Sequence, residues 1–113
     1  MEILGSSQQT MEAALQVRSA RAELLAANVA NADTPGYQSR DLNFDGALTS
    51  ALADPTSASG SSATVAPENI RFDHNDVDVS QQLGRAYENS LDYVATLKLY
   101  GDSLGRIKAA TGT

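Results

Sequence analysis

The chain has 113 residues, a mass of 11.9 kDa and a formal net charge of −6, with a pI near 4.5. This length is enough for one small domain. The acidic charge repels duplex nucleic acid and anionic membranes, so neither is expected as a partner. Apolar residues make up 42% of the chain, but 18 of them are alanine. Leu, Ile, Val and Phe supply only about a fifth of the residues, which argues against a compact, self-sufficient enzyme.

Several classes of protein are excluded by what the sequence lacks. It contains no cysteine, which excludes structural disulfides, cysteine-based zinc sites and thiol catalysis. No apolar run approaches the roughly 20 residues needed to cross a bilayer. The first residues show no basic segment followed by an apolar stretch, so we expect export, if it occurs, without a Sec-type signal.

The segment 8–32 is rich in Ala, Leu, Arg and Glu and contains no Gly or Pro, which predicts a helix. At about 100° per residue this helix has two apolar faces on nearly opposite sides. The first face contains Met11, Leu15, Ala22, Leu25 and Val29. The second face contains Ala13, Val17, Ala20, Leu24 and Ala27.

Arg21 and Asn28 lie on a polar strip between these two faces. A helix in a hairpin needs only one apolar face. We therefore predict that one face contacts the C-terminal helix and the other contacts a neighbouring subunit. The alternative is that the alanines are helix formers on a solvated face.

The predicted helix ends in the sequence Asn-Val-Ala-Asn-Ala-Asp-Thr-Pro-Gly-Tyr, residues 28–37. Asn28 and Asn31 fall in its last turn, where an asparagine side chain can reach free carbonyl groups. Pro35 ends the helix. Thr34 and the three residues after it fit a type II turn, with Pro at the second position and Gly at the third, where φ is positive.

The middle of the chain breaks the helical pattern. We expect extended chain over 37–44 and a flexible loop over 49–67, because the latter is low in complexity and cannot bury enough apolar surface to offset its ordering entropy. The predicted organisation is an N-terminal helix in 1–33, an extended segment and loop in 34–78, and a C-terminal helix in 79–113.

The C-terminal segment 79–110 predicts a second, longer helix with apolar or small residues at steps of four and three, the spacing of a coiled coil. Asp78, followed by Gln81, resembles a capping box at its start. Gly101 and Gly105 lie on a different face, where they mark either the close approach of another helix or a frayed end. The predicted seam consists of Val79, Leu83, Ala86, Ser90, Tyr93, Leu97, Tyr100, Leu104 and Ile107.

The single histidine, His74, has acidic neighbours that suggest a metal site. Asp73 and Asn75 fit the first two ligand positions of an EF-hand loop, but Val77 occupies the third and Gly84 stands where the bidentate Glu is needed. We interpret this segment as a solvated acidic turn before a helix N-terminus. No nucleotide, hydrolase or metalloprotease motif occurs in the sequence, and we predict no catalytic residue, metal, cofactor or small-molecule substrate.

The corner at 28–37 closely resembles the N-terminal signature of bacterial flagellar basal-body rod, hook and related axial proteins. The residues that carry it are Leu25, Asn28, Ala30, Asn31, Thr34, Gly36 and Tyr37. Pro35, followed by the sequence 40–44, makes it most similar to the members that form the proximal rod. A second match is Asn-Asp-Val-Asp at 75–78, with Glu88, Asn89 and Tyr93 beyond it. Gln38 stands where the family commonly has Lys.

The resemblance implies an all-α fold in which the terminal helices form an antiparallel coiled-coil hairpin. It also implies a structural rod subunit in the periplasmic part of the basal body, exported by the flagellar type III apparatus. The implied partners are copies of the chain, other rod proteins, the rod-to-MS-ring adaptor and the MS ring. The predicted protein-interface residues are Leu15, Val17, Leu24, Leu25, Val29, Leu83, Tyr93, Leu97, Tyr100, Leu104 and Ile107.

Two other functions remain as alternatives. A cytosolic helical adaptor or secretion chaperone accounts for the acidity and the heptads, but it gives no reason for the corner at 28–37. A small hydrolase using His74 requires a pocket that this composition can scarcely build.

Overall fold

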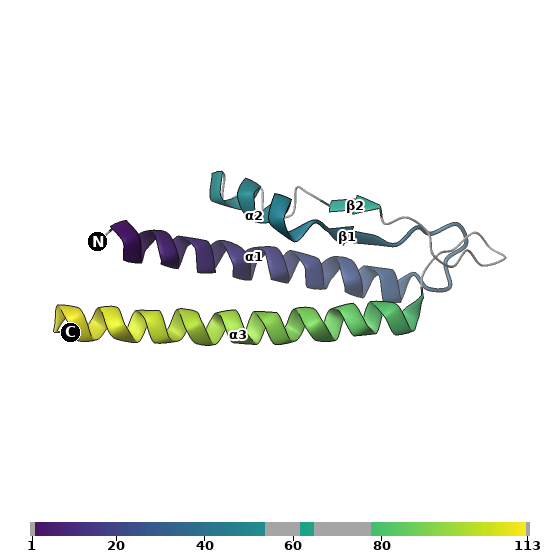
Figure 1. Cartoon of the computed structure of the whole chain (residues 1–113). Coiled ribbons are helices and arrows are strands. Elements are labelled where there is room, and N and C mark those ends of the chain that lie inside the picture. The colour runs from purple at the N-terminus through teal and green to yellow at the C-terminus, as the bar shows by residue number, and fades with distance from the viewer. Residues whose placement is uncertain (1, 54–61, 65–77, 113) are drawn as a thin grey trace.

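The computed structural model describes residues 2–53, 62–64 and 78–112, and the side chains of 7–53 and 78–112. The molecule is elongated, with extents of 62 × 24 × 17 Å. Two long helices lie side by side along its length, α1 (Glu2–Ala30) and α3 (Val79–Thr111) (Figure 1). The predicted all-α hairpin is confirmed.

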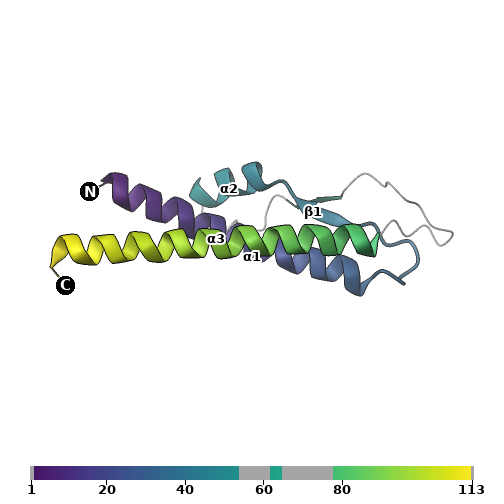
Figure 2. The same ribbon diagram turned by 60° about the horizontal axis from the view of Figure 1, so that its bottom comes forward.

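The helices run antiparallel, as three hydrogen bonds between them show. Near the open end the Tyr100 hydroxyl donates to Glu12, and at the corner Asn28 donates to Gln82. Between them the Asn89 amide donates to the carbonyl oxygen of Arg18. Residue numbers therefore fall along α3 as they rise along α1, and Figure 2 shows α3 crossing in front of α1.

The ends of the long helices follow from local capping. α1 starts six residues before the predicted position and ends at Ala30, and turns follow it. The Asp78 side chain caps α3 by accepting from the backbone N–H of Gln81, as predicted. Gly112, with φ of 75°, closes α3 in the left-handed conformation that favours glycine.

A third helix, α2 (Phe44–Ala53), lies inside the segment where we expected only extended chain and loop. Asn43 starts it, with its carbonyl accepting from Ala47 and its side chain from Gly46. The loop prediction is therefore wrong for 49–53, which are helical, and for 62–64, which form a short strand, while 54–61 and 65–67 lie outside the described residues. Before α2, the short strand β1 (Arg40–Leu42) pairs antiparallel with β2 (Ser62–Thr64).

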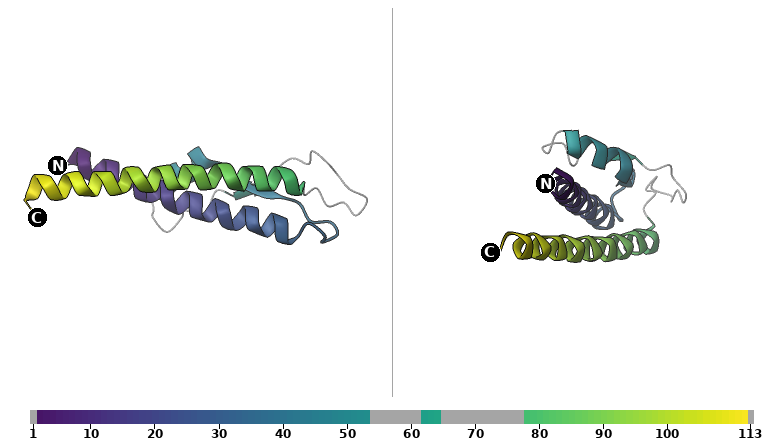
Figure 3. Two further views of the ribbon diagram at one scale, coloured as in Figure 1. Left: turned by 90° about the horizontal axis from the view of Figure 1, so that it is seen from below. Right: turned by 60° about the vertical axis from the view of Figure 1, so that its left-hand side comes forward.

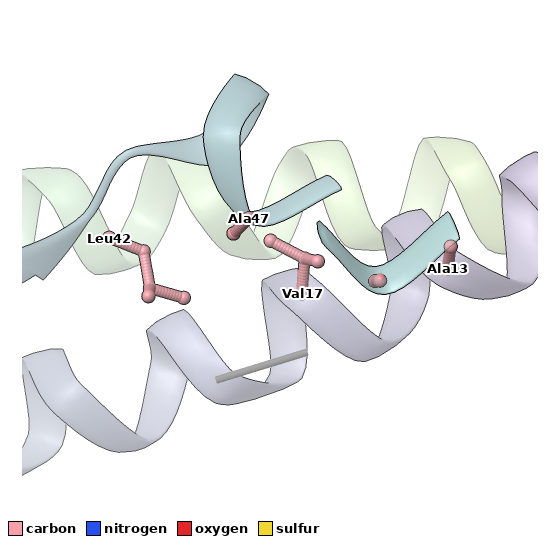
Figure 4. Packing of buried hydrophobic residues seen from close by; sticks show 5 residues of the cluster. Ala13, Val17, Leu42 and Ala47 are labelled. Carbon is pink, nitrogen blue, oxygen red and sulfur yellow. The ribbon is translucent and has the colours of Figure 1, made fainter. Parts of the chain in front are cut away.

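α1 lies between α2 and α3, as the right-hand view of Figure 3 shows. The side chain of Val17 is fully buried where α1 meets α2 and β1, next to Ala47 and Leu42 (Figure 4). Alanines on both helices permit this close approach. The cluster consists of Ala13, Val17, Leu42, Ala47 and Ala51, bordered by Ala20, Leu24, Phe44 and Leu48.

This packing corrects the prediction for the second apolar face of α1. That face, which includes Val17 and Leu24, contacts α2 and β1 of the same chain rather than a neighbouring subunit. The expectation of two contacts for α1 is met, but both contacts are within the chain.

The face that α3 presents to α1 is more polar than the predicted seam. Its buried residues are Gln82, Asn89 and Ser103, which lie at multiples of seven residues. The half-buried positions of the predicted seam are Ala86, Tyr93, Tyr100 and Ile107, whereas its other members are exposed. The exposed members are Val79, Leu83, Ser90, Leu97 and Leu104. The seam is therefore rotated, and much of its apolar surface faces away from α1.

Among the described residues, no other helix approaches Gly101 or Gly105 closely. α3 continues through both glycines to Thr111, so its end is not frayed there. A Cβ atom built at either position has nothing within 4 Å among the described residues. Within the part of the chain that the structure describes, no helix is long and apolar enough to cross a bilayer.

Candidate functional site: the corner after the first helix

The turn that follows α1 has the predicted type II arrangement. The Tyr37 N–H donates to the carbonyl of Thr34 over 3.2 Å, and Gly36 has φ of 75°. The Asn31 side chain donates to the carbonyl of Ala27 over 2.8 Å, and the Asn31 N–H donates to the same oxygen over 3.0 Å. Asn31 therefore reaches a carbonyl of the last turn as predicted, but that carbonyl is not free, and the Asn28 amide donates outside the helix instead.

Asn28 is the centre of the corner. Its side chain is fully buried and uses all of its hydrogen-bonding capacity. Its amide nitrogen donates to the Arg40 carbonyl over 2.7 Å and to Gln82 Oε1 over 2.8 Å. Its oxygen accepts from the Tyr37 hydroxyl over 3.1 Å and from the Arg40 N–H over 2.9 Å. One side chain on α1 thus joins the turn, β1 and α3.

Gln82 carries the corner across to α3. It is fully buried and faces Asn28 near the start of the helix. Its amide nitrogen has no hydrogen-bond partner among the described residues. Burying an amide in place of a leucine lowers the stability of the fold. The hydrogen bond between Asn28 and Gln82 nevertheless permits only one register of α3 on α1, because a slip of one helical turn leaves two buried amides unpaired.

An ion pair supports β1 on the same polar strip of α1. Arg21 binds Asp41 through two hydrogen bonds, of 2.7 Å from Nε and 2.9 Å from Nη2, and both side chains are less than a fifth exposed. The hydrogen bond that Arg21 donates to Asp41 raises the pKa of the Arg21 guanidinium, against the opposing effect of burial. Asp41 also accepts from the N–H of Leu42 over 2.7 Å. The pair therefore positions β1 beside the middle of α1.

Replacing Asp41 with Asn should test this pair, because the amide still accepts from Leu42 but no longer carries charge. We expect Asp41→Asn to lower the free energy of unfolding by about 1–3 kcal/mol, since a bidentate, mostly buried pair is stronger than a surface pair. A double-mutant cycle with Arg21→Met, followed by thermal melting in circular dichroism, measures the coupling. A coupling of zero would show that the pair does not hold β1.

The predicted interface residues of α1 are mostly used within the chain. Leu25 is 1% exposed, and Val17 is completely buried against α2. Leu15, Leu24 and Val29 are half-buried. In this conformation Val17 offers no surface to a second molecule, while the half-buried leucines and valine keep part of theirs.

The predicted interface residues of α3 divide into two groups. Tyr93, Tyr100 and Ile107 are half-buried, and the hydrogen bond from Tyr100 to Glu12 raises the pKa of the Tyr100 hydroxyl. Leu83, Leu97 and Leu104 are 55%, 48% and 42% exposed. Only this second group has a large apolar surface open to another protein.

The structure brings together no residues suited to catalysis or metal binding within the part that it describes. No cluster of three or more His, Asp or Glu side chains able to hold a metal ion occurs among those residues. His74 and its acidic neighbours at 73–77 lie outside them. The described groups at the corner are amides, a phenol and backbone groups that already bind one another, which is a structural joint rather than a reactive site.

Sequence reasoning found the corner but missed how it is connected. Gln82, Arg21 and Asp41 were not predicted as members. The available signal was the polar strip shared by Arg21 and Asn28, seven residues apart, because polar residues repeated between two buried faces must find partners. The sequence alone could not show that those partners come from β1 and from the start of α3.

Comparison with known proteins assigns the chain to a family. A family model described as "Flagella basal body rod protein" matches residues 9–38, which include the corner. Over 116 residues the chain is 37% identical to the "Flagellar basal body rod protein FlgB" of Aeromonas hydrophila, covering 88% of each chain. It is 32% identical to that of Salmonella typhimurium, covering 92% of this chain and 91% of the relative. The corresponding Escherichia coli protein is 31% identical, with 86% of each chain covered. The chain therefore belongs to the FlgB family of flagellar basal body rod proteins.

Proposed function

We propose that the chain is a structural subunit of the flagellar basal body rod that polymerises through its terminal helices. The observation that carries this proposal is the likeness to proteins named FlgB over nearly the whole chain. The structure supports it in two ways. It has a rigid joint at the corner, and it has an elongated shape with apolar surface left open along a helix of 33 residues.

The joint suits a part that must transmit torque. A rotating shaft needs helices that neither slide nor turn relative to one another. The hydrogen bond from Asn28 to Gln82 breaks when α3 shifts along α1, and the shift leaves polar groups of two buried amides unpaired. The other three hydrogen bonds of Asn28 hold β1 and the turn on α1. The corner therefore fixes the position of α3 on α1, and the polar residues that α3 buries assist it.

The open apolar surface suits assembly. The exposed side of α3 and the half-buried Leu15 and Val29 of α1 form the assembly face in this proposal. Val17 is excluded from that role, because it is completely buried where α1 packs on α2 and β1. The proposed partners are copies of the chain, other rod proteins, the rod-to-MS-ring adaptor and the MS ring. We propose a place in the proximal rod, export by the flagellar type III apparatus without a Sec signal, and no enzymatic activity.

Complementation tests this function. A motile bacterium of the family that lacks its own FlgB should regain swimming and complete basal bodies when it expresses the chain or His74→Ala, because no catalytic histidine is needed. The measurements are swimming in soft agar and the amount of the chain in purified basal bodies. A chain that is exported but absent from basal bodies would contradict the proposal, and loss of motility with His74→Ala would favour a hydrolase.

A further inference from the structure

Arg18 contacts both of the helices that pack on α1. It lies near the middle of α1, which is placed between α2 and α3 (Figure 3). Its guanidinium donates from Nη1 to Asp92 Oδ2 of α3 over 3.3 Å. The guanidinium carbon also lies 4.2 Å from the centre of the Phe44 ring, at the start of α2. Two elements that are far apart in the sequence are therefore joined through one side chain.

The two contacts of the Arg18 guanidinium are compatible. The N–H groups of a guanidinium point outward in its plane, so they bind a carboxylate while the cation stays against an aromatic ring. The Arg18 side chain is 16% exposed, so both contacts form in a mostly buried position. The Asp92 side chain is 49% exposed, and an ion pair open to water on one side contributes little by itself. The contact with Asp92 therefore acts mainly by fixing where the guanidinium lies.

The backbone of Arg18 is also bound by α3. The Asn89 amide donates to the Arg18 carbonyl over 2.9 Å, and Asn89 is 2% exposed. Asn89 and Asp92 lie side by side on one face of α3, because residues three apart in a helix are neighbours. Through these two residues α3 holds both ends of Arg18, its carbonyl and its guanidinium. The position and the direction of the side chain thus depend on the docking of α3.

A second arginine links α3 to the same segment. Arg21 binds Asp41 of β1, two residues before α2 begins. That hydrogen bond is the main cause of the raised pKa of Arg21, and the negative charges of Glu88 and Asp92 on α3 raise this pKa further. Acidic groups of α3 therefore act on both of the arginines that hold β1 and the start of α2 against α1.

We propose that Arg18 couples the docking of α2 on α1 to the docking of α3. A free arginine side chain has many rotamers, and ordering it costs conformational entropy. Asp92 and Asn89 order Arg18 when α3 is docked, so the contact with Phe44 then forms without a second loss of this entropy. Detachment of α3 releases the guanidinium and weakens the hold on α2. The coupling goes beyond the proposed function and does not depend on it.

Amide hydrogen exchange of the purified full-length chain measures this coupling. Asp92→Ala removes the carboxylate that binds Arg18, and we expect the protection of the α2 amides to fall about three- to tenfold. Asp102→Ala is the matched control. It removes the same charge from the same helix, at an exposed position about 15 Å further along α3. The control should change the protection of the α2 amides by less than about twofold.

The same exchange measurement in Arg18→Met shows whether Arg18 carries the effect. Methionine keeps an unbranched side chain but has neither the donors nor the charge. In this background Asp92→Ala should change the protection of the α2 amides by less than about twofold, because the link is already absent. Equal losses of protection with and without Arg18 would overturn the inference. Equal losses for Asp92→Ala and Asp102→Ala would overturn it as well.

A double-mutant cycle between Phe44 and Asp92 tests the coupling with Arg18 in place, so it does not depend on the folding of Arg18→Met. Phe44→Leu keeps an apolar side chain but removes the ring. In denaturant unfolding, Phe44→Leu with Asp92→Ala should change the equilibrium constant about three- to tenfold less than the product of the separate effects. Agreement with that product within about twofold would show that the two residues act independently and would overturn the inference. Neither measurement involves rods, so failure of the coupling leaves the proposed function intact, and failed complementation leaves the coupling intact.

Discussion

Replacing Asn28 with alanine is expected to lower the free energy of unfolding by roughly 3–5 kcal/mol, since four hydrogen bonds are lost at about 1 kcal/mol each and one of the partners, Gln82, stays fully buried. The Arg40 carbonyl and Gln82 Oε1 lose a donor, while the Tyr37 hydroxyl and Arg40 N–H lose an acceptor. The melting temperature from circular dichroism should fall by more than about 10 °C. Incorporation into rods should fall with it.

Two further variants identify the cause. Asn28→Asp keeps the contacts with Tyr37 and Arg40 N–H but loses both donor contacts and buries a charge, so it should be at least as harmful as Asn28→Ala. Asn43→Ala removes a single exposed bond of 3.3 Å at the start of α2 and should cost about 1 kcal/mol or less. Equal effects of Asn28→Ala and Asn43→Ala would contradict the central role of Asn28.

The long helices and the turn were predictable because local signals determine them. Asp78 caps α3, and Pro35 with Gly36 sets the turn, through interactions between residues close in sequence. α2 was missed although Phe44, Ala47, Leu48 and Ala51 have helical spacing, because the chain after it is rich in Ser, Ala and Gly and suggested a loop from 49 onward. The helical spacing of these apolar residues was present in the sequence, but it covers only a short segment.

The pairing of the faces could not be predicted from periodicity. The leucines of α3 suggested an apolar seam against α1, yet α3 buries Gln82, Asn89 and Ser103 there. A periodic pattern shows that a face is apolar, but not whether its partner belongs to the same chain. Here hydrogen bonds between amides and backbone set the rotation of α3 within the chain, and the leucine-rich side is left open.

The same reasoning explains why a polar contact within the chain and an apolar surface outside it coexist. Buried amides contribute little net stability, but their hydrogen bonds form in only one register of α3 on α1. Each copy therefore has its helices in the same register. Apolar surface contributes more free energy and less specificity. In the proposed rod, the corner defines the shape of each subunit, and the exposed apolar side of α3 supplies the attraction between subunits.

Replacing Val17 with aspartate should disrupt the fold, whereas the same change at Val94 should not. Val17 is completely buried between α1, α2 and β1, and an unpaired carboxylate there costs several kcal/mol. Val94 is 63% exposed on α3, so Val94→Asp should change the free energy of unfolding by less than about 1 kcal/mol. Val94→Asp should still fail to join rods, because it places a charge on the exposed apolar side of α3 that the proposed function assigns to assembly.

Thermal melting and rod fractionation of the two variants distinguish a core residue from an assembly residue. Val17→Asp should lose both the cooperative melt and incorporation, and amide hydrogen exchange in α2 should rise as this helix detaches from α1. Val94→Asp should keep the melt and lose incorporation alone. If Val17→Asp melted like the parent chain but failed to assemble, α2 would not pack on α1 in solution. The Val17 and Leu24 face would then be the one that binds the neighbouring subunit.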